Sequence, residues 1–440
     1  MPINVTSIRY FVRTDYVRYT SRMEIRNFEA LARSEARRKV LSILQAGYAA
    51  IDIREVLQKT IRLEGDRLFV QHHIFGLNQF EHIYVIGIGK AALAAAEVLE
   101  SMLGEKITAG VILDIRPGNL KRIRTLVGTH PVPTKENTDA AKQIMDLAAG
   151  ATEKDLVLTI ISGGGSALLC YPFDFECTQS QKLYEASVHI GMTIEQMNTI
   201  RKHISEVKGG HLARILHPAT VIGLIFSDIP GDDWELVASG PTYKDTSTVE
   251  DARRLAQDLH IGEFDFRETP KEDIYFQRVT NIGVLCNRFA LEAMAKKAKQ
   301  LGYYPIIYST QIQADAYKTG KLFTELSKPK HVILAGGEPS VIVTTDGKGG
   351  RCQSVGLGAF SHIRDGQTFA AVASDGIDNT DAAGVILDSM SVQKARELGL
   401  HHEEAISTNT AYTFFEKLGD LIFTGPTGTN VSDLLLIVEE

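Results

Sequence analysis

The chain contains 440 residues, of which 44% are hydrophobic and 23% are charged, and its formal net charge is −7. It has no apolar run near the ~18 residues that a membrane-spanning helix needs, so we expect a soluble protein. The net negative charge argues against a surface that neutralises nucleic-acid phosphates and against a basic face for an anionic membrane. A small-molecule partner fits better, and a globular composition at this length predicts two or three domains.

The first 22 residues carry four arginines and one acid and lack the long apolar core of a secretory signal. They are also poor in serine, which is untypical of a transit peptide. An amphipathic helical pattern begins just after Met23. We therefore expect residues 1–22 to be an N-terminal extension that precedes the fold.

The four cysteines are scattered along the chain, at Cys170, Cys177, Cys286 and Cys352. This spacing matches neither a disulfide framework nor a C-x-x-C metal site. A reducing cytoplasm is the simplest compartment for such a chain.

From residue 83 onward, short apolar runs alternate with helical patterns, which predicts parallel sheet with crossover helices and therefore an α/β fold. The charged stretch 246–277 is poor in strand-forming residues and is the predicted junction between two α/β units. The expected strands are 83–88, 110–115, 156–161, 221–226, 282–285, 304–308, 332–334, 368–373 and 433–438.

The first polar loop follows the strand predicted at 83–88 and reads Gly87-Ile88-Gly89-Lys90-Ala91-Ala92. Amides at the start of the following helix suit an anion, and Lys90 would place an ammonium beside a phosphoryl group or a carboxylate. The loop also matches the dinucleotide fingerprint G-x-G-x-x-A, with Asp114 as the acid that would bind the ribose. A tight turn without a ligand is the third interpretation.

Three consecutive glycines follow the strand predicted at 156–161, in the segment Ser162-Gly163-Gly164-Gly165-Ser166. Such glycines let successive backbone N–H groups converge on a phosphate, and the two serines add hydroxyl donors. The alternative is a flexible hairpin. We expect an anion site, because glycines between the carboxyl end of a strand and an apolar helix are typical of one.

Acidic residues follow the strand predicted at 221–226, at Asp228, Asp232 and Asp233. Three carboxylates within six residues can hold a hard cation, although one of them can instead cap a helix. Asp228 is the best single candidate because it lies closest to the end of the strand, at the ligand edge of the sheet.

Four glycine-framed polar loops lie in the second half of the chain. An isolated Arg or Asp is usually a surface residue, but four such loops at strand ends in one α/β unit indicate a binding site. Their candidate functional residues are Glu338, Arg351, Asp375, Asp378 and Asn430.

The ordered set of these motifs resembles the type II glycerate kinases, the glycerate 2-kinases with a MOFRL C-terminal domain. The resemblance spans essentially residues 23–440. It rests on G-I-G-K-A-A at 87–92, T-H-P-V-P at 129–133, S-G-G-G-S-A-L at 162–168, N-x-I-R-K-H at 198–203, S-D-I-P-G-D-D at 227–233, A-S-G-P-T at 238–242, A-G-G-E-P at 335–339, G-G-R-C-Q at 349–353, S-D-G-I-D at 374–378 and G-P-T-G-T-N at 425–430.

The resemblance implies a two-domain α/β architecture with the active site in the cleft between the domains. The larger domain, residues 23–278, would be Rossmann-like, with a parallel sheet in an α/β/α arrangement. The smaller α/β MOFRL domain would cover residues 279–423. Residues 424–440 would pack back on the larger domain.

The implied reaction is the ATP-dependent phosphorylation of D-glycerate at its 2-hydroxyl, which gives 2-phosphoglycerate and ADP, with Mg²⁺ as cofactor. Lys90 and Arg351 match active-site residues of the family, and with Asn430 they would bind the substrate. Asp228 matches a family acid that is either a Mg²⁺ ligand or the base that accepts the hydroxyl proton. Cys352 stands where we expect the family to have Asn, so no side-chain amide is available there.

The remaining expected ligands divide into two sets. The phosphates of the nucleotide would contact Gly87, Gly89, Ser162, Gly163, Gly164, Gly165, Ser166 and Glu338. The metal would be held by Asp228, Asp375 and Asp378.

Two other functions remain open. An NAD(P)-dependent hydroxypyruvate or tartronate-semialdehyde reductase needs the first loop and Asp114, but leaves the second glycine loop and the acidic loops unexplained. A regulator that binds a sugar phosphate has no use for so many acids. Phosphoryl transfer uses anion-binding backbone, fixed cations, Mg²⁺ and an acid near the acceptor hydroxyl, so it accounts for most of the motifs. We expect glycerate as the partner, with no nucleic acid and no membrane, and leave a homo-oligomer open.

Overall fold

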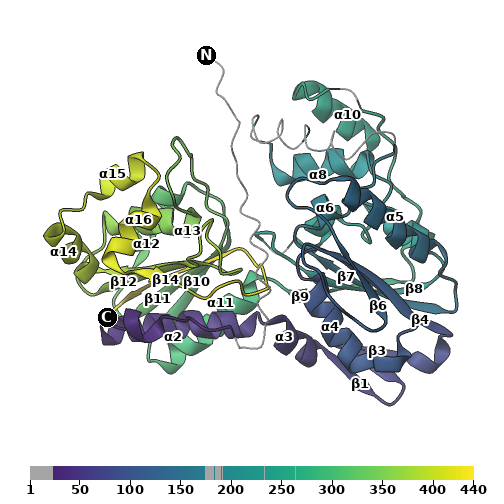
Figure 1. Ribbon diagram of the computed structural model, residues 1–440, viewed down its shortest axis with the longest axis horizontal. Coiled ribbons are helices and arrows are strands. Elements are labelled where there is room, and N and C mark those ends of the chain that lie inside the picture. Colours follow the sequence, from purple (N-terminus) through teal and green to yellow (C-terminus); the bar gives the residue numbers. More distant parts are fainter. Residues whose placement is uncertain (1–22, 174–182, 184–189, 191, 232, 263) are drawn as a thin grey trace.

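The computed structural model describes residues 23–173, 183, 190, 192–231, 233–262 and 264–440. Its two domains lie side by side, and each is built on one six-stranded sheet (Figure 1). The expected extension, residues 1–22, and Asp232 lie outside the described residues. None of the helices in the described part of the chain combines the length and the apolar composition of a bilayer-spanning segment.

The sheet of the larger domain is parallel throughout. Its strands are ordered in space as β6-β5-β4-β7-β8-β9, which is 3-2-1-4-5-6 in chain order, so the expected Rossmann-like arrangement is confirmed. The inner strands are buried on both faces, which is why they form continuous apolar runs in the sequence. The strands are β4 (His82–Ile88), β5 (Ala109–Asp114), β6 (Ile123–Val127), β7 (Asp155–Ser162), β8 (Thr220–Phe226) and β9 (Val279–Leu285).

Helices cover both faces of this sheet. Helices α3 (Ile53–Thr60) and α4 (Ala92–Leu103) share one apolar core with it, and α5 (Lys135–Ala149) and α9 (His211–Leu216) share another. The other elements of the larger domain are an antiparallel sheet of β1 (Ile61–Glu64), β2 (Arg67–Val70) and β3 (His73–Gly76), and helices α6 (Gly165–Leu168), α8 (Ile194–His203) and α10 (Val249–Asp258).

The sheet of the smaller domain is mixed, with the order β10-β11-β15-β12-β13-β14. Only β10 and β11 are parallel, so the predicted parallel sheet is wrong for this domain: β15 runs antiparallel to both of its neighbours. The strands are β10 (Tyr304–Ile312), β11 (His331–Gly337), β12 (Gln367–Ala373), β13 (Gly384–Asp388), β14 (Leu421–Ile422) and β15 (Asp433–Glu439).

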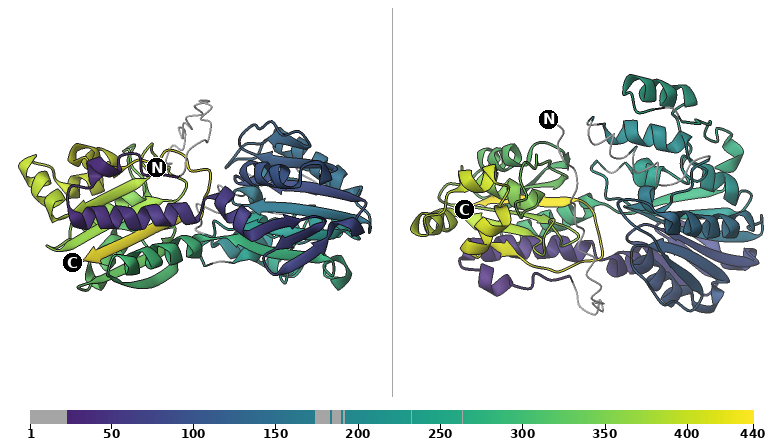
Figure 2. Two further views of the ribbon diagram at one scale, coloured as in Figure 1. Left: turned by 90° about the horizontal axis from the view of Figure 1, so that it is seen from below. Right: turned by 45° about the horizontal axis from the view of Figure 1, so that its top comes forward.

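One face of the second sheet packs on helices that lie between its strands in the chain, and the other face packs on α2 (Glu35–Ala50) and α11 (Asn287–Gln300), which precede it. Both Figure 1 and Figure 2 show α2 beside the smaller domain. The helices of the first face are α12 (Ala316–Leu326), α13 (Arg351–Phe360), α14 (Ser389–Glu397), α15 (His402–Ser407) and α16 (Ala411–Leu418).

The domain boundaries differ from the expected ones. Strand β9 completes the larger sheet, so the larger domain extends beyond residue 278. Strand β15 lies inside the second sheet, so residues 433–439 belong to the smaller domain, and only the loop before this strand contacts the larger domain, through Ser432. The stretch 246–277 is not a junction either, because its helix α10 packs on α8 within the larger domain. These pairings join distant segments, and a local pattern does not reveal them.

The two domains share one apolar core. A single cluster of buried side chains continues from β7 of the larger sheet through α2 and α11 to β15 of the second sheet. Leu158, Leu44, Leu291 and Leu436 belong to this cluster. Because separating the sheets would expose it to water, the core opposes relative movement of the domains.

Three of the cysteines lie in the described residues, and all three are buried. Cys286 and Cys352 form no disulfide, and burial raises the pKa of the Cys352 thiol well above its usual range. Cys170 is disulfide-bonded, which the scattered spacing did not predict, because a single bond leaves no repeated pattern in the sequence.

A buried ion cluster ties α2 to the smaller domain. The Arg37 guanidinium contacts Asp388 Oδ2 at 2.7 Å and Asp420 Oδ1 at 2.9 Å, and it also donates to Ser391 Oγ at 2.7 Å. Arg37 and Asp420 are completely buried. Two buried carboxylates therefore share one buried cation, and Asp420 is also paired with the partly exposed Arg33 at 3.0 Å.

We predict that Arg37→Met destabilises the protein by about 3–5 kcal/mol, because it leaves the buried Asp388 without the Arg37 cation, while Asp420 keeps its contact with Arg33. Urea denaturation followed by circular dichroism measures the effect. Arg38→Met is the matched control, since the neighbouring Arg38 pairs with Glu29 at the surface and its loss should leave the midpoint nearly unchanged. Equal shifts in both variants would contradict the prediction.

Candidate active site

The strand order places the two predicted glycine loops together. Strands β4 and β7 are neighbours at the point where the order of the larger sheet reverses. Ligands of open α/β sheets bind outside the carboxyl ends of the strands at such a point. Lys90 follows β4 and Gly163 follows β7, so both loops lie at this position.

The first loop is held by hydrogen bonds within the protein. The Lys90 amide donates to the Gly163 carbonyl at 2.9 Å, and the Ala91 amide donates to Ser162 Oγ at 3.1 Å. Gly89 has a φ of +112°, and a Cβ there would lie 2.2 Å from Ser162 Oγ. The Gly89 amide donates to the Leu113 carbonyl at 3.0 Å, Gly87 lies within β4, and Ser162 Oγ donates to the Ile88 carbonyl at 3.1 Å. These donors are therefore occupied, so we do not retain Gly87, Gly89 or Ser162 as phosphate ligands.

Asp114 is not placed to bind a ribose. Its side chain is completely buried, and it accepts hydrogen bonds from the amides of Leu93 and Arg116 and from the Arg116 guanidinium. Burial raises the pKa of this carboxyl, and Arg116 counteracts part of the rise. Asp114, which would be the ribose-binding acid of a dinucleotide fingerprint, thus holds the start of α4.

The second loop passes very close to Asp228. A Cβ at Gly163 would lie 2.0 Å from Asp228 Oδ2, so only glycine lets the carboxylate lie against this loop. The Lys90 side chain lies over the next residue, since a Cβ at Gly164 would be 3.1 Å from Lys90 Cε. One ammonium and one carboxylate therefore flank the loop.

The end of this loop is supported by two other segments. Ser166 Oγ lies 2.9 Å from Ser239 Oγ, which donates to Asn198 Oδ1 at 2.8 Å. Ala238 and Ser239 both have positive φ, at 52° and 62°, which is strained for residues with a side chain. Within the described part of the chain, the amides of Gly164, Gly165 and Ser166 have no acceptor, and they remain candidate anion donors.

The smaller domain contributes a second charged group, centred on Arg351. Its Nη2 contacts Glu338 Oε1 at 3.3 Å and its Nε contacts Asp433 Oδ2 at 3.2 Å. Arg351 opens α13, Glu338 follows β11 and Asp433 opens β15, so three elements converge here. Burial raises the pKa of Asp433, and Arg351 opposes this shift.

The predicted metal acids have separate environments. Asp378 is buried and accepts from the amides of Cys352 at 3.0 Å and Gln353 at 2.8 Å, so it caps α13. Asp375 accepts from the Ile377 amide and lies near the charges of Lys90 and Arg351. No group of three or more His, Cys, Asp or Glu in the described residues is arranged to hold a metal ion. The expected trio with Asp228 is thus not assembled in the structure.

The charged groups of the two domains face each other. Burial and the negative charge of Glu338 in the smaller domain together raise the pKa of Asp228 to about 6, against an opposing effect of Lys90. Ser432 Oγ donates to the Asp228 carbonyl at 2.6 Å across the same boundary. A pocket lined by both Lys90 and Asn430 lies between the domains. The structure therefore brings together Lys90, Asp228, Glu338, Arg351, Asp375 and Asn430.

Other residues of the site were not singled out from the sequence. Asp433 lies within an apolar strand, with nothing in the pattern to mark it as an ion-pair partner. Asn198 and Ser239 belong to the N-x-I-R-K-H and A-S-G-P-T motifs, which supported the resemblance but were given no role.

Two family profiles match most of the chain. The domain of unknown function DUF4147 matches residues 39–266, and the MOFRL family matches residues 331–433. The chain is 34% identical to a glycerate 2-kinase of Pyrococcus horikoshii, over 90% of this chain and 96% of that protein. It is also 34% identical to a putative hydroxypyruvate reductase of Agrobacterium vitis, over 80% of this chain and 86% of that protein.

The fold agrees with these similarities. A crystal structure of a glycerate kinase from Thermotoga maritima superposes with a TM-score of 0.81 at 28% identity, over 91% of this chain and 99% of that chain. The chain belongs to the type II glycerate kinases, a family of enzymes.

We predict that Asp228→Asn raises Tm at pH values above 6 and that this increase in Tm becomes smaller as the pH falls toward 4. An unfolded Asp titrates near pH ~4, whereas the folded carboxyl has a pKa of about 6. Between these values the folded state keeps a proton that the unfolded chain has lost, so ionisation of Asp228 destabilises the fold as the pH rises. Melting curves from pH 4 to 8 measure the difference between variant and wild type.

Asp139→Asn is the control, because Asp139 lies exposed on α5. Its melting curves should follow those of the wild type at every pH. A gain for Asp228→Asn that does not change with pH would contradict the assigned pKa.

Proposed function

We propose that the protein phosphorylates D-glycerate at its 2-hydroxyl with ATP and releases 2-phosphoglycerate and ADP. The observation that carries the proposal is the proximity of Lys90 and Asp228 of the larger domain to Glu338 and Arg351 of the smaller one, beside an interdomain pocket that Lys90 and Asn430 line. Phosphoryl transfer depends on positioned cations and on an acid at the acceptor hydroxyl. The similarity to the Pyrococcus horikoshii glycerate 2-kinase supports the same reaction, and the similarity to the Thermotoga maritima glycerate kinase supports glycerate as the acceptor.

The loop 163–166 is the proposed phosphate cradle. The amides of Gly164, Gly165 and Ser166 would donate to phosphate oxygens, and the Lys90 ammonium beside Gly164 would neutralise charge on the transferring group. Gly163 contributes by its lack of a side chain, which lets Asp228 approach this loop. The donors are thus in place before the phosphate arrives.

Arg351 and Asn430 are the proposed ligands of glycerate. A guanidinium matches the geometry of a carboxylate, and Arg351 is already oriented by its contacts with Glu338 and Asp433. Asn430 lines the same pocket as Lys90, so a three-carbon acid there would lie within reach of both domains. Lys90 and Arg351 would then hold opposite ends of the reacting pair.

Asp228 is the proposed acceptor of the proton from the 2-hydroxyl. A general base works best when its pKa lies near the operating pH, and the pKa of about 6 meets this condition better than that of an ordinary aspartate. Its contact with the Gly163 position keeps it beside the loop that would carry the phosphoryl group. The hydroxyl oxygen and the phosphorus would thus meet next to the base.

The alternative role of Asp228 is to hold, together with Glu338, a Mg²⁺ ion that arrives with the nucleotide. The two carboxylates repel each other, as the raised pKa of Asp228 indicates, and a divalent cation would offset this repulsion. Mg²⁺ is usually held by one or two carboxylates together with substrate phosphates, so a preassembled trio of acids is not required. When bound, the ion would neutralise charge on the phosphates. Asp375 is close enough to Lys90 and Arg351 to contribute, whereas Asp378 is committed to α13.

The reductase alternative has the name of the Agrobacterium vitis relative in its favour. In the sequence, this alternative relied mainly on Asp114, which is buried and accepts hydrogen bonds from the amides of Leu93 and Arg116. A ribose would have to displace these contacts, so the proposed kinase fits the site better.

We predict that the purified protein releases ADP when ATP, Mg²⁺ and D-glycerate are present together, and that phosphorus NMR identifies the product as 2-phosphoglycerate. A coupled assay measures ADP release. Oxidation of NADH or NADPH with hydroxypyruvate, measured at 340 nm, should stay at background. Nicotinamide oxidation without ADP release would overturn the proposed function, and formation of 3-phosphoglycerate would overturn the assigned hydroxyl.

We predict that Lys90→Met and Arg351→Met each lower kcat by roughly 10²–10³, because removal of one preorganised charge donor commonly costs this much. If both act on one transition state, the double variant loses less than the product of the single losses. Steady-state kinetics of the four proteins test this. Strict multiplicativity would contradict shared action, and normal turnover of a single variant would remove that residue from the mechanism.

Two controls accompany these variants. Lys142→Met changes an exposed lysine on α5 and should leave kcat unchanged. Arg351→Lys keeps a cation near the buried Asp433, so it separates loss of catalysis from loss of the fold.

A further inference from the structure

The Ser166 end of the loop 163–166 is held by hydrogen bonds among three side chains. Ser239 Oγ donates to Asn198 Oδ1 at 2.8 Å and lies 2.9 Å from Ser166 Oγ. A hydroxyl has one proton, and that of Ser239 goes to Asn198, so the Ser166 hydroxyl donates to Ser239. The sequence suggested this hydroxyl as a phosphate donor, but its proton is already used within the protein. The amide of Ser166 is the group that remains to donate to an anion.

The turn that carries Ser239 is a buried support for the loop. A Cβ at Gly165 would lie 2.5 Å from Ala238 Cβ, so the loop lies directly against this turn. The Ser239 carbonyl accepts from the Gly209 amide at 3.0 Å, which ties the turn to the segment before α9. Ser239 is completely buried, and its φ of 62° is one that glycine adopts with less strain. Stability alone would therefore favour glycine here, and the hydroxyl is what serine adds.

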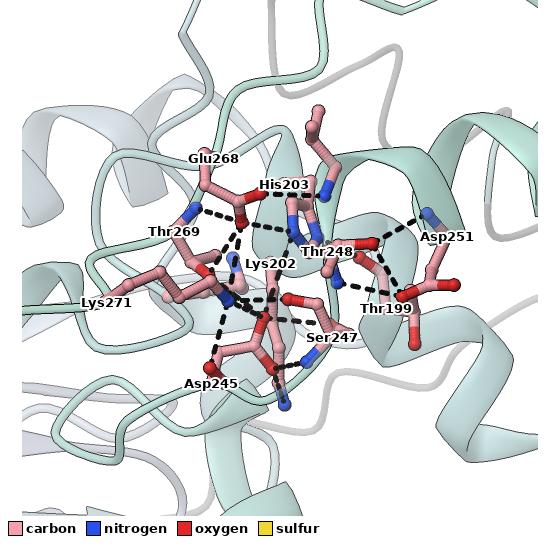
Figure 3. Close-up of polar contacts among 12 residues, drawn as sticks. Thr199, Lys202, His203, Asp245, Ser247, Thr248, Asp251, Glu268, Thr269 and Lys271 are labelled. Atoms are coloured by element: carbon pink, nitrogen blue, oxygen red, sulfur yellow. Dashed lines mark hydrogen bonds and ion pairs between the residues drawn. The ribbon is translucent and has the colours of Figure 1, made fainter.

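Asn198, at the other end of these hydrogen bonds, is held in place by its helix. Figure 3 shows the polar network at the C-terminal end of α8, where Lys202 Nζ contacts Asp245 Oδ1 at 3.0 Å. In the same network His203 Nε2 lies 3.2 Å from Glu268 Oε1. Asn198 lies one turn before Lys202, on the same side of the helix. The network thus holds the helix face from which Asn198 reaches Ser239.

We propose that Asn198 and Ser239 are positioning residues for phosphoryl transfer, which act through the Ser166 hydroxyl to keep the amides of the loop 163–166 oriented toward the phosphate. The inference rests on the proposed function and deepens it, because it gives a role to two residues that would not contact the substrate. Three free amides on a glycine-rich segment have many accessible orientations, and a tether at one end removes most of them. The donors are then preorganised without the loop itself being rigid.

The test is a double-mutant cycle of Ser166→Ala and Ser239→Ala, followed by steady-state kinetics with ATP, Mg²⁺ and D-glycerate. Each single variant should lower kcat by about 5- to 50-fold, because a displaced donor costs more than the hydrogen bond that held it. Both changes break the same link, so the double variant should lose about as much as one single variant. The KM for glycerate should change less than about 3-fold, since its proposed ligands lie on the smaller domain. Ser407→Ala, which removes an exposed hydroxyl of α15, is the control and should behave like the wild type.

Ser239→Gly separates positioning from stability, because it removes the hydroxyl and also relieves the positive φ. Its Tm should equal or exceed that of Ser239→Ala, while its kcat should be as low. Asn198→Leu, which removes the acceptor, should lower kcat in the same range as the serine variants.

Normal turnover of Ser239→Gly, or of Asn198→Leu, would overturn the inference while leaving the proposed function intact. Losses that multiply in the double variant would also overturn it, and would indicate that the Ser166 hydroxyl donates directly to the phosphate. A wild type that does not phosphorylate glycerate would overturn the proposed function and this inference with it.

Discussion

The relative position of the two sheets is the constraint on which the site depends, because neither domain carries a complete set of charged groups. Lys90 and Asp228 follow strands of the larger sheet, while Glu338 and Arg351 border strands of the second. The apolar core that continues through α2 and α11 opposes separation of the sheets. At the rim, the hydrogen bond from Ser432 to the Asp228 carbonyl adds a polar link. The shared apolar core thus keeps the charged groups of the two domains close to each other.

The site is costly in its unliganded form. Burial raises the pKa of Asp228, Asp375 and Asp433, and each of these carboxyls also lies close to another acid. A stable fold would gain by replacing them, yet ionisable groups with displaced pKa values are what proton transfer and ion binding require. The strained backbone at Ala238 and Ser239, beside the glycine loop, also lowers stability next to the candidate site. Stability is therefore sacrificed where the chemistry is proposed to occur.

Much of the larger domain was predictable, because its inner strands are buried on both faces and form unbroken apolar runs. Strand β6 was missed, since it is an edge strand whose side chains are half exposed. The site residues at strand ends were also predictable, because topology brings such ends together. The predicted roles were wrong for groups whose partners are distant in sequence. Asp378 caps a helix that begins 27 residues earlier in the chain, at Arg351. The hydroxyl of Ser162 accepts from the Ala91 amide and so links two loops. Local sequence patterns reveal periodic burial, and single contacts between distant residues leave no such period in the sequence.

The path of the chain between the domains has a consequence for protein synthesis. Helix α2 is made before the whole larger domain, but its packing partner α11 begins only at Asn287. At ~5–20 residues per second, the apolar face of α2 leaves the ribosome roughly 10 to 50 s ahead of that partner. The central strand of the second sheet, β15, is made last of all its strands and carries Asp433. The larger domain is therefore able to fold while translation continues, whereas the smaller domain exposes an apolar helix to the cell until elongation is nearly finished.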